Sequence, residues 1–214
     1  SSDVCSSDLA AVDRDLRSLR QGVADFEVGQ ARGKHAGRHT TAQATAGNLA
    51  IRTLGNLDAT AVSATGLVSL TSDTGALHTT GAVTGNGITL KAAGNVLTDA
   101  AVTSGGALTI QAGGTFTAGA AVSAAGNVAI TATQGLTAAR LTSGGTTQLG
   151  ASNGAIAVTT DLVSPGAVTA SGRSVDLVSS GALTFTGLTA SAGNASVTAR
   201  EFAPQLLHDR PRVH

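Results

Sequence analysis

The chain repeats one short phrase about every 20 residues between Gly47 and Ala199. Each copy starts with a pair such as Gly-Asn or Gly-Gly and continues as a run in which apolar residues alternate with small or polar ones. The clearest copies are GNLAIRT (47–53), TGLVSLTS (65–72), GNGITLKA (85–92), GGALTIQA (105–112) and GNVAITA (126–132). A period of this length is typical of solenoids, in which each repeat packs only on its neighbours.

Three columns of apolar residues follow this period, and we expect them to form the core. The first column consists of the pairs Leu49/Ile51, Val68/Leu70, Ile88/Leu90, Leu108/Ile110 and Val128/Ile130. The second column consists of Leu57, Leu77, Leu97, Phe116, Leu136 and Ile156. The third column consists of Val62, Val83, Val102, Val122, Leu141 and Leu162. Three columns per period predict three short strands per coil.

The local pattern within each column indicates strands. In Leu108-Thr109-Ile110 one residue separates two apolar ones, so successive side chains point to opposite faces. Glycine recurs several times per period and β-branched residues are frequent, which disfavours helices. We therefore predict an all-β fold over residues 47–199: a right-handed, single-stranded parallel β-helix. The handedness follows from the rule for parallel crossovers.

The glycine pairs lie between the strands, where the chain must turn. We expect corners with positive φ there, because Gly, and less readily Asn, adopts that conformation at low cost.

The period breaks once, near the only proline of the repeat region. After Thr147/Leu149, the next clear first-column pair is Val175/Leu177, 28 residues further on. The extra residues include Ser164-Pro165-Gly166, and proline cannot donate to a strand ladder. Residues 150–171 are therefore predicted to carry a loop that bulges from one coil, after which the pattern resumes through Leu183, Leu188 and Ala195/Val197.

The N-terminal flank differs in composition from the repeats. Residues 1–9, SSDVCSSDL, resemble the in-frame translation of a sequencing adapter and are interpreted as an artefact, which removes the only cysteine, Cys5. Residues 10–27 predict a short amphipathic helix. Its apolar face consists of Val12, Leu16, Leu19, Val23 and Phe26. Residues 28–46 are predicted to be loop. Residues 10–46 as a whole are interpreted either as a cap over the end of the solenoid or as a segment translated out of frame.

The C-terminal flank, residues 200–214, contains Pro204 and Pro211 and no repeat. It is predicted to be an irregular tail.

The composition argues against several classes of partner. The formal net charge is zero, so the chain has no basic excess that would attract nucleic acid. Trp and Tyr are absent, which disfavours carbohydrate recognition by aromatic stacking, and the repeated GGxGxD pattern of calcium-binding β-rolls does not occur. We expect no cofactor, no metal and no small-molecule substrate.

A polysaccharide-acting enzyme is the main alternative on a parallel β-helix, but it needs acids clustered on one face. The five aspartates of the repeat region are scattered over different coils: Asp58, Asp73, Asp99, Asp161 and Asp176. Asp58 and His78 each follow a second-column residue, so they are predicted to be outward neighbours on adjacent coils. With no third group beside them they are interpreted as a surface pair, and no catalytic residue is predicted.

Two further surface features have ordinary explanations. Hydroxyl residues follow each third-column position and predict a ladder on one outer face, interpreted as a polar β surface rather than an ice-binding face. Its members are Ser63, Thr84, Thr103, Ser123 and Thr142. The sequon Asn194-Ala195-Ser196 is interpreted as a chance occurrence.

The Gly-Asn-x-apolar-x-apolar phrase, in a context rich in Gly, Ala and Thr, resembles the shaft repeats of filamentous haemagglutinin-like bacterial exoproteins. The resemblance covers residues 47–199 and rests on pattern and composition. It implies a segment of a secreted or cell-surface, virulence-associated exoprotein, exported by an outer-membrane two-partner secretion transporter through an N-terminal domain that nothing in this sequence matches. The same shaft carries adhesins, haemolysins and contact-dependent inhibition toxins, so a toxin stalk and a face that binds host glycans or matrix remain alternatives.

Overall fold

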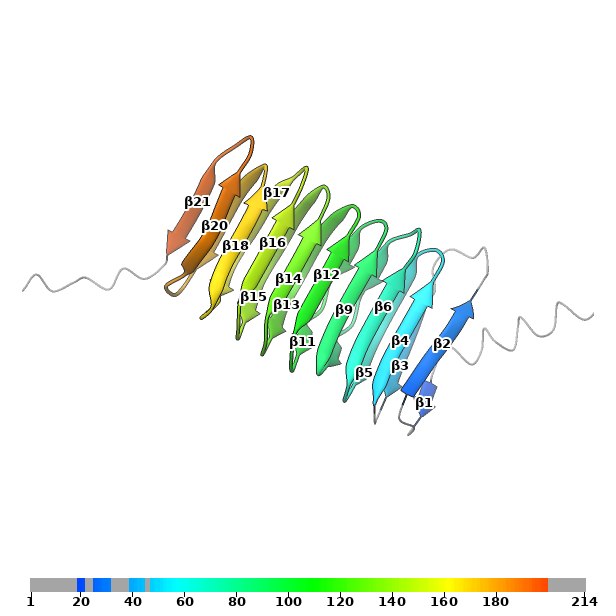
Figure 1. The fold of residues 1–214 in the computed structure, drawn as a ribbon. Helices are drawn as coiled ribbons and strands as arrows, with labels where there is room; N and C mark the ends of the chain where they lie inside the picture. The colour runs from blue at the N-terminus through cyan, green and yellow to red at the C-terminus, as the bar shows by residue number, and fades with distance from the viewer. Residues whose placement is uncertain (1–18, 22–24, 32–38, 45–46, 200–214) are drawn as a thin grey trace, which may run out of the picture.

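The computed structural model describes residues 19–21, 25–31, 39–44 and 47–199. In these residues the protein is all-β, and parallel strands stack into a β-solenoid of about eight turns. The strands lie side by side in one row from β1 and β2 at one end to β20 and β21 at the other (Figure 1). The predicted artefact at residues 1–9 and the predicted tail at 200–214 lie outside the described residues.

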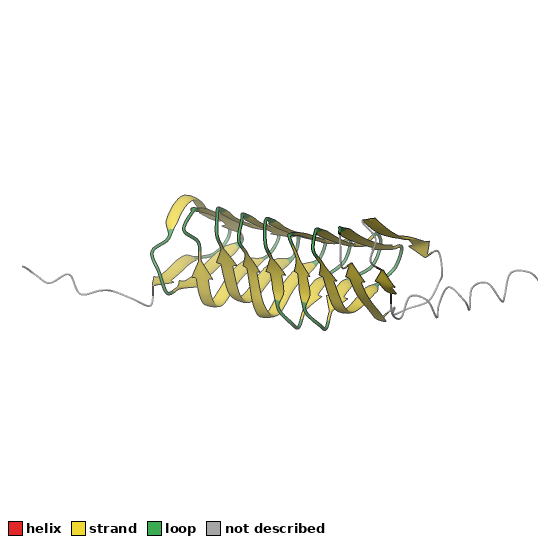
Figure 2. Cartoon of the chain, turned by 90° about the horizontal axis from the view of Figure 1, so that it is seen from below, coloured by secondary structure: helices red, strands yellow, loops and turns green. Residues whose placement is uncertain are grey.

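Two sheets form the walls of the solenoid, and all strand pairings described in them are parallel. The nine-stranded sheet contains β2 (Asp25–Ala31), β4 (Asn48–Thr53), β6 (Leu67–Ser72), β9 (Gly87–Ala92), β12 (Leu108–Ala112), β14 (Val128–Ala132), β16 (Thr147–Ala151), β18 (Ala167–Gly172) and β20 (Thr184–Ala190). The two walls face each other along the whole rod (Figure 2).

The twelve-stranded sheet contains the remaining strands. They are β1 (Leu19–Gln21), β3 (His39–Ala44), β5 (Leu57–Ala64), β7 (Leu77–Thr79), β8 (Val83–Gly85), β10 (Val96–Thr98), β11 (Val102–Ser104), β13 (Thr115–Ala124), β15 (Gly135–Ser143), β17 (Ala155–Val163), β19 (Ser174–Ser179) and β21 (Ala195–Ala199).

The predicted first and third columns are confirmed as core. Leu108 and Ile110 are buried, and their strand β12 pairs with β9 and β14 so that Ile110 lies between Leu90 and Ile130. In the second column one member is wrong: Val96, not Leu97, is buried and pairs with Leu77 and Phe116. Because Val96 and Leu97 are both apolar, the sequence does not show which of the two side chains points into the core. Pairing with the neighbouring coils selects Val96.

The three columns are distributed over two sheets. The second and third columns both belong to the twelve-stranded sheet, and β5, β13, β15 and β17 each run through both. Only in the coils of residues 77–85 and 96–104 is this segment divided into two strands. The long strands bend where the pairing shifts register, as between Ala118 and Ala121 in β13.

The predicted loop within residues 150–171 is wrong. Thr147 pairs with Val168 and Leu149 with Ala170, so the next first-column pair follows after 21 residues and the coil is of ordinary length. Pro165 is exposed at the corner between β17 and β18, where no ladder bond is required of it. Val175 and Leu177 belong to the second wall, since Val175 pairs with Ile156.

The predicted N-terminal helix is also wrong where the structure describes it. Residues 19–21 and 25–27 lie in strands β1 and β2, and residues 28–31 and 39–44 of the predicted loop are likewise strand. Phe26 and Val28 pair with Leu49 and Ile51. The apolar-x-apolar phrase at 26–28 therefore continues the first column, and pairing with the neighbouring strand outweighs the helical spacing. The solenoid thus begins before residue 47.

The glycines at the corners are required by close packing rather than by positive φ. Among the described residues, only Gly47 and Gly135, the first residue of β15, have positive φ. At Gly144 a Cβ atom would overlap the Ala125 carbonyl of the preceding coil. The asparagines act through their side chains instead: the Asn127 Oδ1 accepts a hydrogen bond from the Thr146 N–H at 2.9 Å. Asn56 and Asn95 make the same bond to Ala76 and Thr115.

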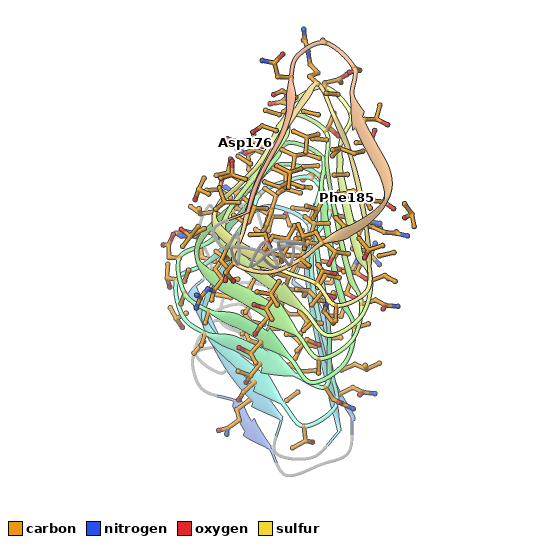
Figure 3. All side chains as sticks on the ribbon, turned by 90° about the vertical axis from the view of Figure 1, so that its left-hand side faces the viewer. Asp176 and Phe185 are labelled. Atoms are coloured by element: carbon orange, nitrogen blue, oxygen red, sulfur yellow. The ribbon has the colours of Figure 1, made fainter. Side chains whose placement is uncertain are left out.

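The last described coil is shorter and less buried than the others. Val168 pairs with Phe185, a step of 17 residues, and β19 pairs with only the first half of β17. Viewed along the axis from this end, Asp176 and Phe185 lie on opposite walls (Figure 3). Phe185 is half-buried, and Leu188 and Val197 are 36% and 41% exposed.

Candidate functional site

His78 lies at the centre of the one cluster of titratable side chains that sequence reasoning singled out. Asp58 and His78 are register partners on β5 and β7, as predicted, and both point outward. The Nδ1 atom of His78 lies 3.7 Å from the Asp58 Oδ1. This separation is longer than an ordinary hydrogen bond, so the two groups are neighbours with a gap between them.

A third group, Asp99, joins this pair, and the sequence analysis missed it. The His78 Nε2 lies 2.7 Å from the Asp99 Oδ2, which is a short, charge-assisted hydrogen-bond distance. Asp99 directly follows β10, and its backbone N–H donates to the Thr79 carbonyl at 2.9 Å. The signal was present in the sequence: once Val96 is the inward residue, alternation turns Asp99 outward, next to His78.

The geometry of the cluster does not provide a catalytic triad. Both ring nitrogens of His78 face carboxylates, and in the part of the chain that the structure describes no hydroxyl or thiol is hydrogen-bonded to the imidazole. A nucleophile activated by a base requires such a contact. The His78 side chain is 33% exposed and Asp99 50%, so solvent reaches the cluster.

The remaining predicted aspartates lie elsewhere. Asp73 forms an ion pair with Arg52 on the neighbouring coil, with 3.0 Å between the Arg52 Nε and the Asp73 Oδ2. The hydrogen bond and the charge of Asp73 raise the pKa of the Arg52 guanidinium above its ordinary value. Asp161 is buried, accepts the Ser180 N–H at 2.8 Å and lies 3.6 Å from Arg140. Asp176 is exposed on β19. No two of these acids share a site.

The predicted hydroxyl ladder is present on the twelve-stranded sheet. Thr103 pairs with Thr84 on one side and with Ser123 on the other, and the ladder continues from Ser63 to Thr142. The Ser123 Oγ donates to the Thr103 Oγ1 at 3.4 Å. The next position is Val163, so the ladder ends there. Asn194 of the sequon is exposed between β20 and β21.

A shallow groove of about 310 Å³ runs beside His78 over β7, β10 and β13. It is lined by the outward Leu97 and by polar residues that include His78, Asn95 and Thr117. Leu97 thus lies in a surface groove rather than in the core where the sequence placed it. A second groove, of about 350 Å³, surrounds Pro165.

No group of three or more His, Cys, Asp or Glu side chains in the described part of the chain is arranged to hold a metal ion. Within the same residues there is no helix with the length and apolar character needed to span a membrane.

Comparisons with known proteins identify no relative. Neither the protein-family comparison nor the searches of curated proteins and of solved structures return a match to this chain.

Proposed function

We propose that this chain is a segment of the shaft of a secreted or surface-exposed bacterial exoprotein, of the filamentous haemagglutinin-like type, that holds adhesive or toxic parts away from the cell. The observation that carries this proposal is the unbroken parallel pairing of the nine-stranded sheet from β2 to β20. Backbone hydrogen bonds in this ladder run along the rod axis, so the axis is the direction in which the structure is stiffest.

The core supports a mechanical role. It consists of stacked aliphatic side chains with one aromatic, Phe116, among the largest fully buried residues. Each coil repeats the contacts of the one before it, so additional coils lengthen the rod through the same contacts. A rod that holds other parts of a protein away from the cell requires no reactive residue. The proposed partner is an outer-membrane two-partner secretion transporter, and the proposed location is extracellular.

Single-molecule stretching tests the mechanical role. A shaft pulled at its two ends is expected to resist extension and then to unfold in successive steps of about one coil. Each step should release roughly 70 Å of chain, since about 20 extended residues span this length. A single low-force collapse of the whole repeat region would contradict the proposal.

A glycan-binding or matrix-binding face is a second candidate, favoured by the groove beside His78. An array of glycans and matrix proteins probed with the purified chain separates the two roles. Saturable binding that disappears in Leu97→Asp would make this face adhesive, whereas a pure shaft binds nothing above background. Release of oligosaccharides from a polysaccharide by the same sample would instead indicate an enzyme.

A further inference from the structure

The solenoid is open at the end formed by its last described coil. β20 and β21 are the last strands of the nine-stranded and the twelve-stranded sheet, and no strand of the described chain lies beyond them. Figure 3 views this end along the axis, with the coil of β20 and β21 nearest the viewer. Each of the two strands therefore has one edge with which no described strand pairs, and such an edge is a template for another strand.

Core positions are exposed at this end. Leu188 pairs with the buried Ala170, and Val197 pairs with the buried Leu177. Register partners share a face of the sheet, so Leu188 and Val197 occupy core positions. Both are nevertheless exposed, and Phe185 of the same coil packs against the core but is only half-buried. Phe185, Leu188 and Val197 together form an apolar surface, which we call the end patch.

The two free edges lack the features that usually keep edge strands apart. Natural proteins protect such edges with charged side chains, proline or bulges. β20 reads TFTGLTA and β21 reads ASVTA, so neither contains a charged residue or a proline. β20 has one register shift in its pairing with β18, whereas β21 pairs with β19 over five residues without a shift. β21 is therefore the more regular edge and the better template for a further strand.

A second copy of the same end fits both the patch and the edges. The nearest charged residues in the sequence are Asp176 and Arg200, so the strands themselves offer nothing to a charged partner. A two-fold axis normal to the sheets would place β20 antiparallel to β20 of the second copy, and β21 antiparallel to its β21. Inner faces remain inner under this rotation, so each end patch would cover the other.

We propose that two copies of this chain associate end to end through β20 and β21, so that both sheets continue from one copy into the other. The contact uses the same surface on both copies, so it closes at two, whereas head-to-tail stacking would grow into fibres. Val197 is the middle residue of β21, and a centred antiparallel pair would place it opposite its counterpart. This inference does not depend on the proposed shaft function.

Sedimentation velocity and small-angle X-ray scattering of the full chain, over a range of concentrations, test the proposal. The mass is expected to rise with concentration and to level off at twice that of one chain. The maximum dimension should nearly double, because the rods join at their ends. A monomer at every concentration, a dimer no longer than the monomer, or a mass that continues to grow would each overturn the proposal.

Charge placed in the end patch should prevent the contact. Val197→Lys and Leu188→Lys should each weaken dimerisation by at least about tenfold, because an unpaired charge is costly to bury. Both side chains are already exposed in a single copy, so the fold should be retained, and circular dichroism and Tm check this. Unchanged dimerisation in both variants would exclude the end patch as the interface.

Thr198→Lys is the matched control. Thr198 pairs with Val178, which lies between the buried Leu177 and Ser179, so alternation turns Thr198 to the outer face of the same strand. It should dimerise as the wild type does. A loss equal to that of Val197→Lys would mean that added charge, and not its place in the end patch, disrupts the dimer.

A cysteine at position 197 locates the contact. In a Cys5→Ser background, Val197→Cys should form a disulfide-linked dimer in the presence of dissolved O₂, because antiparallel partners have Cα atoms about 4.5–5.5 Å apart. Gln111→Cys, at an exposed position in the middle of the rod, should remain unlinked under the same conditions. Cross-linking that is absent, or equal in the two variants, would exclude a contact centred on β21.

Discussion

The two walls of the solenoid follow different rules of construction. From β4 to β18 the nine-stranded sheet pairs without any register shift, one straight strand per coil. In the twelve-stranded sheet the pairing shifts within β5, β13 and β15. In these middle coils the register shifts within strands therefore lie in one wall, and the other wall pairs without them.

The spacing between the second and third columns, which both lie in the twelve-stranded sheet, varies in the same way. The second and third columns are five residues apart at Leu57/Val62 and Leu136/Leu141 but six apart at Phe116/Val122. The first-column pairs of the described middle coils always have one residue between them. The wall that tolerates variation is also the wall that carries Asp58, His78 and Asp99 and the groove over Leu97.

Two single-residue deletions test this difference most directly. Deletion of Thr109 in β12 would place Leu108 next to Ile110 and turn one of them outward. We expect it to cost at least about 3 kcal/mol, the transfer free energy of a buried Leu or Ile plus the lost packing around it. Deletion of Gly119 shortens the spacing from Phe116 to Val122 to the five residues already found in two other coils.

The Gly119 deletion should therefore cost no more than about 1 kcal/mol, which is ordinary for a change at an exposed bend. Urea unfolding of the two variants beside the wild type measures both values. Equal destabilisation would mean that the twelve-stranded sheet is as strict as the nine-stranded one.

Substitutions on the two faces of β12 test the register inside the strict wall. Ile110 is fully buried, whereas its neighbour Thr109 is half-buried on the outer face. Ile110→Asp should destabilise the protein by about 4 kcal/mol or more, since it removes a core side chain and buries a carboxylate. Thr109→Asp should cost at most about 1 kcal/mol. Similar decreases in Tm for both variants would contradict the observation that Ile110 points into the core and Thr109 points outward.

The same contrast explains how far the sequence could predict the fold. In the strict wall, pairs such as Leu108/Ile110 recur at a constant period, and their burial was predicted correctly. The loop within residues 150–171 was predicted wrongly because the first-column pair after Thr147/Leu149 is Val168/Ala170, and alanine was not counted as a core residue. In this narrow solenoid alanine does fill core positions: Ala170, Ala118 and Ala138 are all buried.

The candidate site was harder to predict because it depends on the wall with variable spacing. The Asp58 and His78 pairing follows directly from the period. Asp99 was missed because Val96 and Leu97 are both apolar, and only stacking on Leu77 and Phe116 selects Val96 for the core.

Two buried threonines offer a smaller test in the wall with variable spacing. Thr79 and Thr98 are register partners, both fully buried, and their hydroxyls have no hydrogen-bond partner. They lie where the second and third columns are divided into separate strands. Thr79→Val and Thr98→Val should each stabilise the fold by about 1 kcal/mol, because an unsatisfied buried hydroxyl is costly.

Ser143→Ala provides the matched control for these two variants. The Ser143 hydroxyl is also buried, but it contacts the Gly126 and Thr146 carbonyls at 3.1 Å and accepts the Gly145 N–H at 3.2 Å. Its loss should destabilise the protein by about 1–3 kcal/mol. Destabilisation by the valine substitutions as well would mean that the threonine hydroxyls have partners inside the rod, such as a bound water.

The smallest effect is expected at the ion pair on the outside of the strict wall. Arg52 and Asp73 link β4 to the corner after β6, with both carboxylate oxygens 3.0 Å from the Arg52 Nε. The Arg52 side chain is 60% exposed, so water and salt screen the attraction. The pKa of the Arg52 guanidinium is raised, so the stabilisation from its pair with Asp73 is present at pH values below the ordinary arginine pKa. This stabilisation is lost only as the pH rises above that range.

Arg52→Gln should therefore leave Tm at neutral pH within the scatter of the wild type, at low salt and at 1 M NaCl alike. A clear loss at low salt that disappears at high salt would show instead that ion pairs across coils help the nine-stranded sheet to hold its register.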